Sequence, residues 1–168
     1  MLEEAAESPE VVARQLRENA ALMADIGAHL RQRPPRAVVT CARGSSDHAA
    51  TYAKYLFETR ARVLTASAAL SVSSVYRVEL DLRDCLFIAI SQSGESPDLL
   101  ASAAAAKRSG ATVIALCNVV DAPLCREADF TIPMWAGTEH SVAATKSFLA
   151  SLAALDARKN PSAESHKT

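Results

Sequence analysis

The sequence predicts an α/β domain, a three-layer sandwich around a five-stranded, mainly parallel sheet. Five short apolar runs alternate with helical stretches that are either rich in alanine or amphipathic. Helices of this length between strands give right-handed crossovers, which make the strands parallel and cover both faces of the sheet. Apolar residues make up 49% of the chain but aromatic residues only 5%, which favours close helix–sheet packing over an aromatic-rich sandwich. The 168 residues fit one domain with a substantial core.

The predicted elements follow one another without an evident linker or internal repeat. A long amphipathic helix begins at Ser8-Pro9-Glu10, where serine is the cap and proline takes the first helical position, and it ends near Arg31. The predicted strands are residues 37–41, 62–66, 85–90, 112–117 and 130–133. The predicted helices are residues 46–58, 97–109, a turn within 121–128, and 141–155, while 67–76 shows no clear pattern. Residues 1–155 would thus form the domain, and the polar segment 156–168, which contains Pro161, would be a frayed tail.

Charge and cysteine usage exclude several classes of protein. The formal net charge is -1 and the basic residues are scattered, so nucleic acid is not an expected partner. The amino terminus is acidic, and no apolar run reaches the ~18 residues that a membrane helix needs, so we expect neither a secretory leader nor a membrane span. The cysteines lack CxxC spacing, which favours reduced, buried thiols, no metal site and a cytoplasmic location. They are Cys41, Cys85, Cys117 and Cys125.

The segment 91–97, here named the serine loop, joins a predicted buried strand to an alanine-rich helix. Its sequence is Ser91-Gln92-Ser93-Gly94-Glu95-Ser96-Pro97. Ligands of open α/β sheets bind where strands end and helices begin, because helix N-termini present free N–H groups and a positive dipole end. A glycine lets the backbone turn sharply there, and serine hydroxyls add short hydrogen bonds. The segment therefore predicts a site for a phosphorylated small molecule.

A second glycine–serine loop follows the first predicted strand. Gly44 stands there with Ser45 and Ser46, ahead of the helix that contains His48. One such loop alone is most often an ordinary turn and cap, but two in one α/β chain favour a ligand crevice. Neither loop has the spacing of a Walker loop, a dinucleotide fingerprint or a hydrolase elbow, so no nucleotide cofactor is expected. His48, in the first turn of its helix, is more typical of a packing or solvent-facing residue than of a base.

A third segment, residues 136–147, again joins a short strand to a helix. Glu139 and His140 resemble an acid/base pair, but adjacent side chains rarely point to one spot. Glu139 is equally explained as an acid at a helix start. Lys146 can pair with a carboxylate or a ligand, and a structural or solvated role is favoured on residue type alone.

These three segments together resemble the signature loops of the SIS (sugar isomerase) family. The matching motifs are Arg43-Gly44-Ser45-Ser46, Ser91-Gln92-Ser93-Gly94-Glu95-Ser96, Ala136-Gly137-Thr138-Glu139 and Val142-Ala143-Ala144-Thr145-Lys146-Ser147. The likeness extends to about Leu155 and is strongest to the first SIS domain in the isomerase half of glucosamine-6-phosphate synthase and to its stand-alone deaminase and isomerase relatives. It implies a five-stranded parallel, flavodoxin-like sheet and a phosphosugar ligand such as fructose 6-phosphate or glucosamine 6-phosphate.

The resemblance also implies which residues bind the ligand. The hydroxyl and amide groups of the serine loop would hold the phosphate, Ser45 and Ser46 would contact the phosphate and the sugar hydroxyls, and the Val142 backbone would face the sugar chain. The expected binding set is Gly44, Ser45, Ser46, Ser91, Gln92, Ser93, Gly94, Ser96, Val142, Ala143 and Lys146.

The chain also departs from the family pattern. Family enzymes contain two SIS units, and the catalytic glutamate, histidine and lysine belong to the second unit, for which this chain shows no counterpart. The expected function is therefore phosphosugar binding as the first half of an aminosugar-phosphate isomerase or deaminase, with the catalytic residues unknown. One alternative is a single-domain isomerase, with Glu139, His140 or His48 as acid or base; another is a non-catalytic phosphosugar sensor. The resemblance further implies a homodimer.

Overall fold

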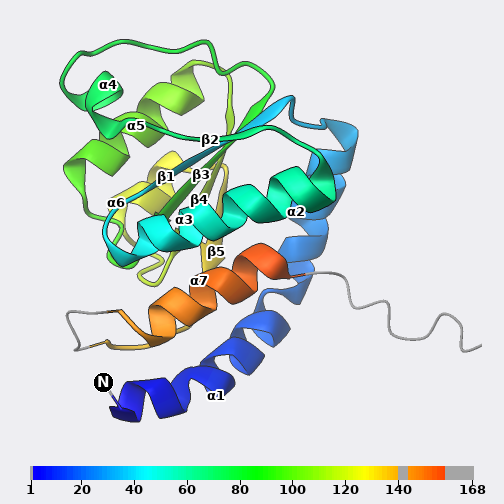
Figure 1. The fold of residues 1–168 in the computed structure, drawn as a ribbon, viewed down its shortest axis with the longest axis vertical. Coiled ribbons are helices and arrows are strands. Elements are labelled where there is room, and N and C mark those ends of the chain that lie inside the picture. The colour runs from blue at the N-terminus through cyan, green and yellow to red at the C-terminus, as the bar shows by residue number, and fades with distance from the viewer. Residues whose placement is uncertain (1, 140–143, 158–168) are drawn as a thin grey trace, which may run out of the picture.

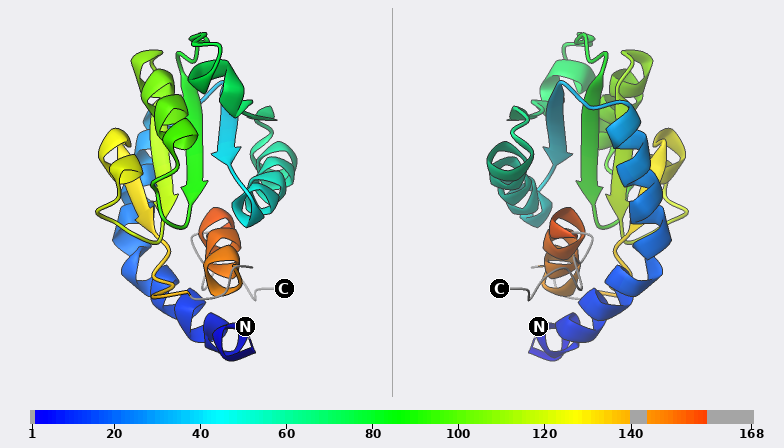
Figure 2. Two further views of the ribbon diagram at one scale, coloured as in Figure 1. Left: turned by 90° about the vertical axis from the view of Figure 1, so that its left-hand side faces the viewer. Right: turned by 90° about the vertical axis from the view of Figure 1, so that its right-hand side faces the viewer.

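The computed structural model describes residues 2–139 and 144–157 of the chain. It confirms the α/β prediction, because five parallel strands form one sheet in the order β2-β1-β3-β4-β5. Helices cover both of its faces, as Figures 1 and 2 show. The strands are β1 (Ala37–Ala42), β2 (Thr65–Ser67), β3 (Cys85–Ser91), β4 (Thr112–Cys117) and β5 (Phe130–Pro133).

The central strand β3 is buried along its whole length and divides the core in two. Because side chains alternate along a strand, Leu86, Ile88 and Ile90 face one layer of helices, while Phe87 and Ala89 face the other. The first layer contains α1 (Leu2–Glu18), α2 (Ala20–Gln32), α3 (Ser45–Leu56) and α7 (Lys146–Asp156). The second contains α5 (Pro97–Arg108) and α6 (Pro123–Glu127), with the short α4 (Leu70–Ser74) beside α5.

The first helix begins at Leu2 rather than at Ser8, so the predicted start was wrong. Pro9 lies inside α1, where proline removes a backbone hydrogen bond and normally breaks a helix. Tertiary packing overrides this preference, because α1 lies against α7 and Val11 is buried in the core between them. The Ser8 hydroxyl donates to the Glu4 carbonyl 3.2 Å away, within the turn before the proline. Burial therefore extends the helix where local signals predict a start.

The long helix also bends at Asn19, which separates α1 from α2. Its backbone N–H donates to Gln15 at 3.0 Å and its carbonyl accepts from Met23 at 2.8 Å, so the hydrogen bonding continues across the bend. Figure 2 shows the two helices as one bent arm beside the sheet.

Other predicted boundaries differ for local reasons. β2 begins three residues later than predicted, because a π-helical turn (Phe57–Ala61) prolongs α3 and Arg62 then takes a left-handed conformation with φ 56°. The unassigned segment 67–76 contains α4. Residues 144 and 145, predicted as helix, precede α7. Asp156, predicted as the first tail residue, ends α7 and pairs with Arg60; residues 158–168 of the expected tail lie outside the described part.

The strand order fixes where a ligand can bind. After β1 the chain crosses through α3 to β2, and after β3 it crosses through α5 to β4, on the opposite face and in the opposite direction. Loops that diverge in this way leave a crevice at the carboxyl ends of β1 and β3. Within the described residues, no helix is both long and apolar enough to span a membrane.

Candidate functional site

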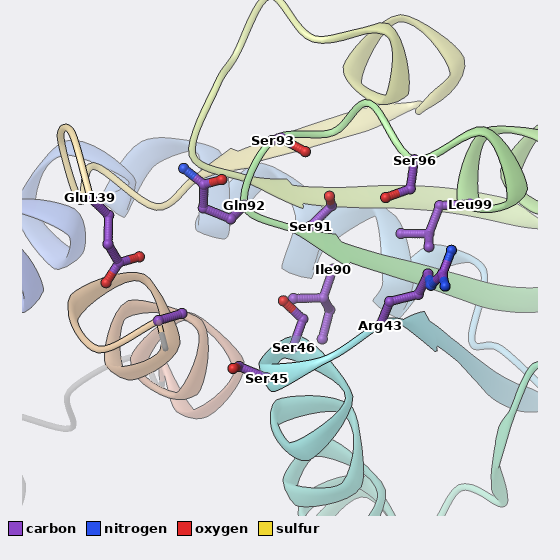
Figure 3. Close-up of a pocket in the computed structure, with 11 residues that line it drawn as sticks. Arg43, Ser45, Ser46, Ile90, Ser91, Gln92, Ser93, Ser96, Leu99 and Glu139 are labelled. Carbon is purple, nitrogen blue, oxygen red and sulfur yellow. The ribbon is translucent and has the colours of Figure 1, made fainter. Parts of the chain in front are cut away.

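A cavity of about 230 Å³ lies at the carboxyl ends of β1 and β3. Figure 3 shows that it is bounded by all three segments singled out in the sequence: the loop after β1, the serine loop after β3, and the segment before α7. Its lining residues are Arg43, Ser45, Ser46, Ile90, Ser91, Gln92, Ser93, Ser96, Leu99, Glu139 and Ala144. The first and second of these segments lie almost 50 residues apart in the chain, and the second and third lie more than 40 apart. The parallel sheet therefore brings together segments that are distant in the sequence.

The serine loop curves around a small space that receives three hydroxyl groups. Figure 3 shows the side chains of Ser91, Ser93 and Ser96 turned toward it. The Ser91 hydroxyl accepts a hydrogen bond from Gly94 N–H at 2.9 Å, which closes the turn. Ser96 is the N-cap residue of α5, yet its side chain makes no capping hydrogen bond, so its hydroxyl is not consumed by the helix. The loop thus presents donors together with the first turn of α5.

Position 94 requires glycine for two reasons: its backbone conformation and the lack of room for a side chain. Its φ is +67°, and a Cβ atom there would lie 2.5 Å from the Cβ of Ala122 and 3.3 Å from the sulfur of Cys117. The loop is held against this support by two backbone hydrogen bonds: Leu124 N–H donates to the Gly94 carbonyl at 3.1 Å, and Asn118 N–H donates to the Gln92 carbonyl at 3.2 Å. The glycine lets the loop lie flat against α6 and the end of β4.

The loop after β1 adds a second helix start. Gly44 has φ +57° and ψ −133°, a conformation that glycine adopts readily, with open space where a Cβ would lie. Ser45 and Ser46 then form the first residues of α3 and line the cavity. Because α3 and α5 both begin here, the positive dipole ends of two helices lie at one cavity, an arrangement suited to an anion.

Glu139 closes the third side of the cavity and caps α7. One carboxylate oxygen accepts from the backbone N–H groups of Thr145 at 2.6 Å and Lys146 at 2.9 Å, and the other accepts from the Ser147 hydroxyl. These contacts satisfy the first amides of α7 and explain why the helix begins at Lys146. The geometry is that of an acid at a helix start.

Several residues of the expected site lie away from the cavity or outside the described chain. Lys146 is buried, with its side chain 5% exposed, and its ammonium donates to Glu7 of α1 at 2.7 Å rather than lining the cavity. His48 is exposed on α3 and does not line the cavity either. His140, Val142 and Ala143 lie outside the described residues, so their roles stay predictions.

Asn118, at the end of β4, is a residue that the sequence analysis missed. Its side-chain oxygen accepts from Ala136 N–H at 2.9 Å, and its side-chain nitrogen donates to the Gly137 carbonyl at 2.7 Å. Together with its backbone bond to Gln92, Asn118 ties the serine loop to the segment that leads to Glu139. No glycine or serine cluster marks Asn118 in the sequence. The available signal was its position directly after β4, the strand that pairs with β3.

Two buried thiols lie in the strands near the cavity, Cys41 in β1 and Cys117 in β4. Burial raises the pKa of Cys41 to about 12, and the nearby carboxylates of Asp98 and Asp47 act in the same direction. Burial likewise raises the pKa of Cys117, and its interaction with Cys125 acts in the same direction. Since the thiolate is the nucleophilic form, the raised pKa values disfavour nucleophilic chemistry at Cys41 and Cys117. The site therefore offers hydrogen-bond donors and helix ends rather than a nucleophile.

The sequence also matches the family model of the SIS domain over residues 31–158. The chain belongs to the SIS domain family. This SIS domain is 37% identical over 162 residues to the glutamine–fructose-6-phosphate aminotransferase (isomerizing) of Pseudomonas aeruginosa, a match that covers 92% of the chain and 26% of the relative.

Two solved structures share both fold and sequence with this SIS domain. A "putative phosphosugar isomerase" from Silicibacter pomeroyi DSS-3 superposes with a TM-score of 0.88 at 43% identity, covering 94% of this chain and 50% of the other. The C-terminal domain of glucosamine-fructose-6-phosphate aminotransferase from Francisella tularensis superposes with a TM-score of 0.78 at 32% identity, covering 92% and 44%. The chain thus spans about half of these solved chains and about a fifth to a quarter of the curated relatives.

Proposed function

We propose that this SIS domain binds a phosphosugar in the cavity, with the phosphate group at the serine loop. The observation that supports this most strongly is the convergence of two helix N-termini, those of α3 and α5, on a space lined by serine hydroxyls. Phosphate oxygens accept hydrogen bonds from backbone N–H groups at helix starts and are stabilised by the helix dipole. In the proposed pose, Ser91, Ser93 and Ser96 with Gln92 surround the phosphate, while Ser45 and Ser46 contact it and the sugar hydroxyls.

The names of the relatives indicate the class of sugar. The curated relative is named for fructose 6-phosphate, and the solved relatives are named for phosphosugars and for the same aminotransferase reaction. We therefore infer a ligand of the fructose 6-phosphate or glucosamine 6-phosphate class. Contacts of the sugar chain with the Val142 backbone, Ala143 and Lys146 belong to this proposal, and Lys146 would have to exchange its Glu7 partner to make one.

We infer that the domain serves as the binding half of an aminosugar-phosphate isomerase or deaminase. Such a reaction moves a proton between neighbouring sugar carbons, and its acid and base must lie within hydrogen-bond reach of them. A single-domain isomerase would need Glu139, His140 or His48 for this task. Of the two candidates within the described residues, Glu139 is already engaged with the amides of α7 and His48 lies outside the cavity lining, which favours a binding role.

Titration calorimetry with fructose 6-phosphate and glucosamine 6-phosphate tests the binding proposal directly. The wild-type chain should bind at least one of them, and unphosphorylated fructose should bind far more weakly. Ser96→Ala should weaken binding roughly tenfold, because it removes a hydrogen bond to a charged group. Ser109→Ala, which removes a hydroxyl at the other end of α5, is the matched control and should bind as the wild type does. Absence of binding to both sugar phosphates at millimolar concentration would overturn the proposal.

We also infer that the domain is a cytoplasmic homodimer. The free cysteines support a reducing location. Apolar side chains exposed between α4 and β3 offer a surface for a second copy: Val75, Tyr76, Val78 and Leu80. Light scattering coupled to size-exclusion chromatography tests the dimer, and a monomer at micromolar concentration would contradict it.

A further inference from the structure

The cavity carries less positive charge than a phosphate dianion demands. Of the described residues that line it, Arg43 is the one cation and Glu139 the one carboxylate. Two further carboxylates lie close to the serine loop: Glu95 within it and Asp98 in the first turn of α5. Helix ends and hydroxyls stabilise an anion, yet each carboxylate opposes a second negative charge. A doubly charged ligand therefore needs a full positive charge close by.

Arg43 occupies the position from which it can supply that charge. It follows β1 directly, and its guanidinium Nη1 donates to the Asp98 carboxylate on α5 at 2.9 Å. The side chain therefore reaches from the end of β1 to the helix that follows β3. Figure 3 shows the guanidinium near Leu99, on the Ser96 side of the cavity. The second Asp98 oxygen accepts from Leu99 N–H at 3.0 Å, which fixes the carboxylate at the helix start.

The ion pair between Arg43 and Asp98 is not a tight structural lock. The Arg43 side chain is 62% exposed, and ion pairs of this kind contribute little because water screens the charges. A phosphate bound by Ser96 at the start of α5 can therefore share or take over the guanidinium. Arginine suits this role, since its planar donors match phosphate oxygens in a bidentate arrangement.

We propose that Arg43 is the specificity-determining cation of this site, which selects a phosphate dianion over a singly charged group on the same sugar. The inference rests on the proposed phosphosugar function and adds to it the residue that recognises the second charge. Asp98 neutralises Arg43 while the site is empty and is not itself a ligand contact.

The test compares two ligands and two variants by titration calorimetry at pH 8. The ligands are a hexose 6-phosphate, which is a dianion at this pH, and the 6-sulfate of the same hexose, which is a monoanion. Arg43→Gln should weaken phosphate binding about tenfold to a hundredfold, the range for removing a hydrogen bond between charged groups. It should weaken sulfate binding only about threefold or less, so that discrimination between the two falls. Arg43→Lys keeps the charge without the bidentate geometry and should lie in between.

Asp98→Asn is the matched control, because it breaks the same ion pair but keeps the cation. It should retain or strengthen phosphate binding, whereas a loss equal to that of Arg43→Gln would mean that the pair supports the loop and would overturn the inference. Equal affinity of Arg43→Gln and wild type for the phosphate would also overturn it. If the wild type binds neither ester, the phosphosugar proposal fails and this inference with it. Circular dichroism of each variant establishes that the fold is intact.

Discussion

Replacing Asn118 by alanine should destabilise the loops that surround the cavity without changing any residue that lines it. The side chain makes two hydrogen bonds to backbone groups, to Ala136 N–H at 2.9 Å and to the Gly137 carbonyl at 2.7 Å. Each contributes about 1 kcal/mol net, and Ala136 is buried, so its N–H would lose its partner away from water. We therefore expect a loss of about 2–3 kcal/mol in the free energy of unfolding. For a domain of this size that corresponds to a fall in Tm of roughly 4–12 °C.

Urea denaturation followed by circular dichroism measures this loss. Asn118→Asp should give an intermediate value, since it keeps an acceptor for Ala136 but replaces the donor to Gly137 by a second oxygen. Gln32→Ala, which removes an exposed amide at the end of α2, is the control and should change stability by less than about 0.5 kcal/mol. If Asn118→Ala is as stable as this control, the two hydrogen bonds do not hold the loops together and the reasoning is wrong.

Three further predictions concern glycine and cysteine residues near the cavity. Gly94→Ala should cost about 3 kcal/mol or more, because a left-handed conformation is combined with a Cβ atom 2.5 Å from Ala122; Gly44→Ala, with open space around it, should cost only the 1–3 kcal/mol of backbone strain. Equal melting temperatures for the two variants would contradict this. Cys41 should stay unmodified by iodoacetamide at pH 8 in the native protein, while half-buried Cys125 reacts first, as peptide mass mapping would show. Because the pKa of Cys41 is raised in the fold, its contribution to stability is complete below pH 9 and is lost as the pH rises toward 12.

The elements that the sequence predicted best are those determined by local patterns. The strands at 112–117 and 130–133 have the predicted bounds, because each is a short apolar run between turn residues. The start of α5 at Pro97 was also predicted, since Ser96, Pro97 and Asp98 are the residues that favour a helix start. In these places local preference and tertiary packing agree, so a short window of sequence was sufficient.

The elements that the sequence could not predict depend on contacts between distant segments. Nothing near Leu2 signals a helix start, and α1 extends to it because its face lies against α7, where Glu7 pairs with the buried Lys146. The start of α7 is likewise set by Glu139, whose carboxylate caps amides six and seven residues further on. The same holds for Asn118, since its partners become neighbours only once β4 and β5 pair.

The choice of loops for the site follows from the strand order. Five parallel strands end at the same edge of the sheet, yet the glycine–serine loops follow β1 and β3, the two strands between which the connections diverge. The segment after β4, which contains Asn118 and α6, lies against the connection that follows β3 and supports the serine loop. A loop rich in glycine and serine is costly to order, and it is useful only where the crevice opens. The two glycine–serine loops are therefore those that this topology leaves open to a ligand, and Arg43 is the cation that the same divergence places between them.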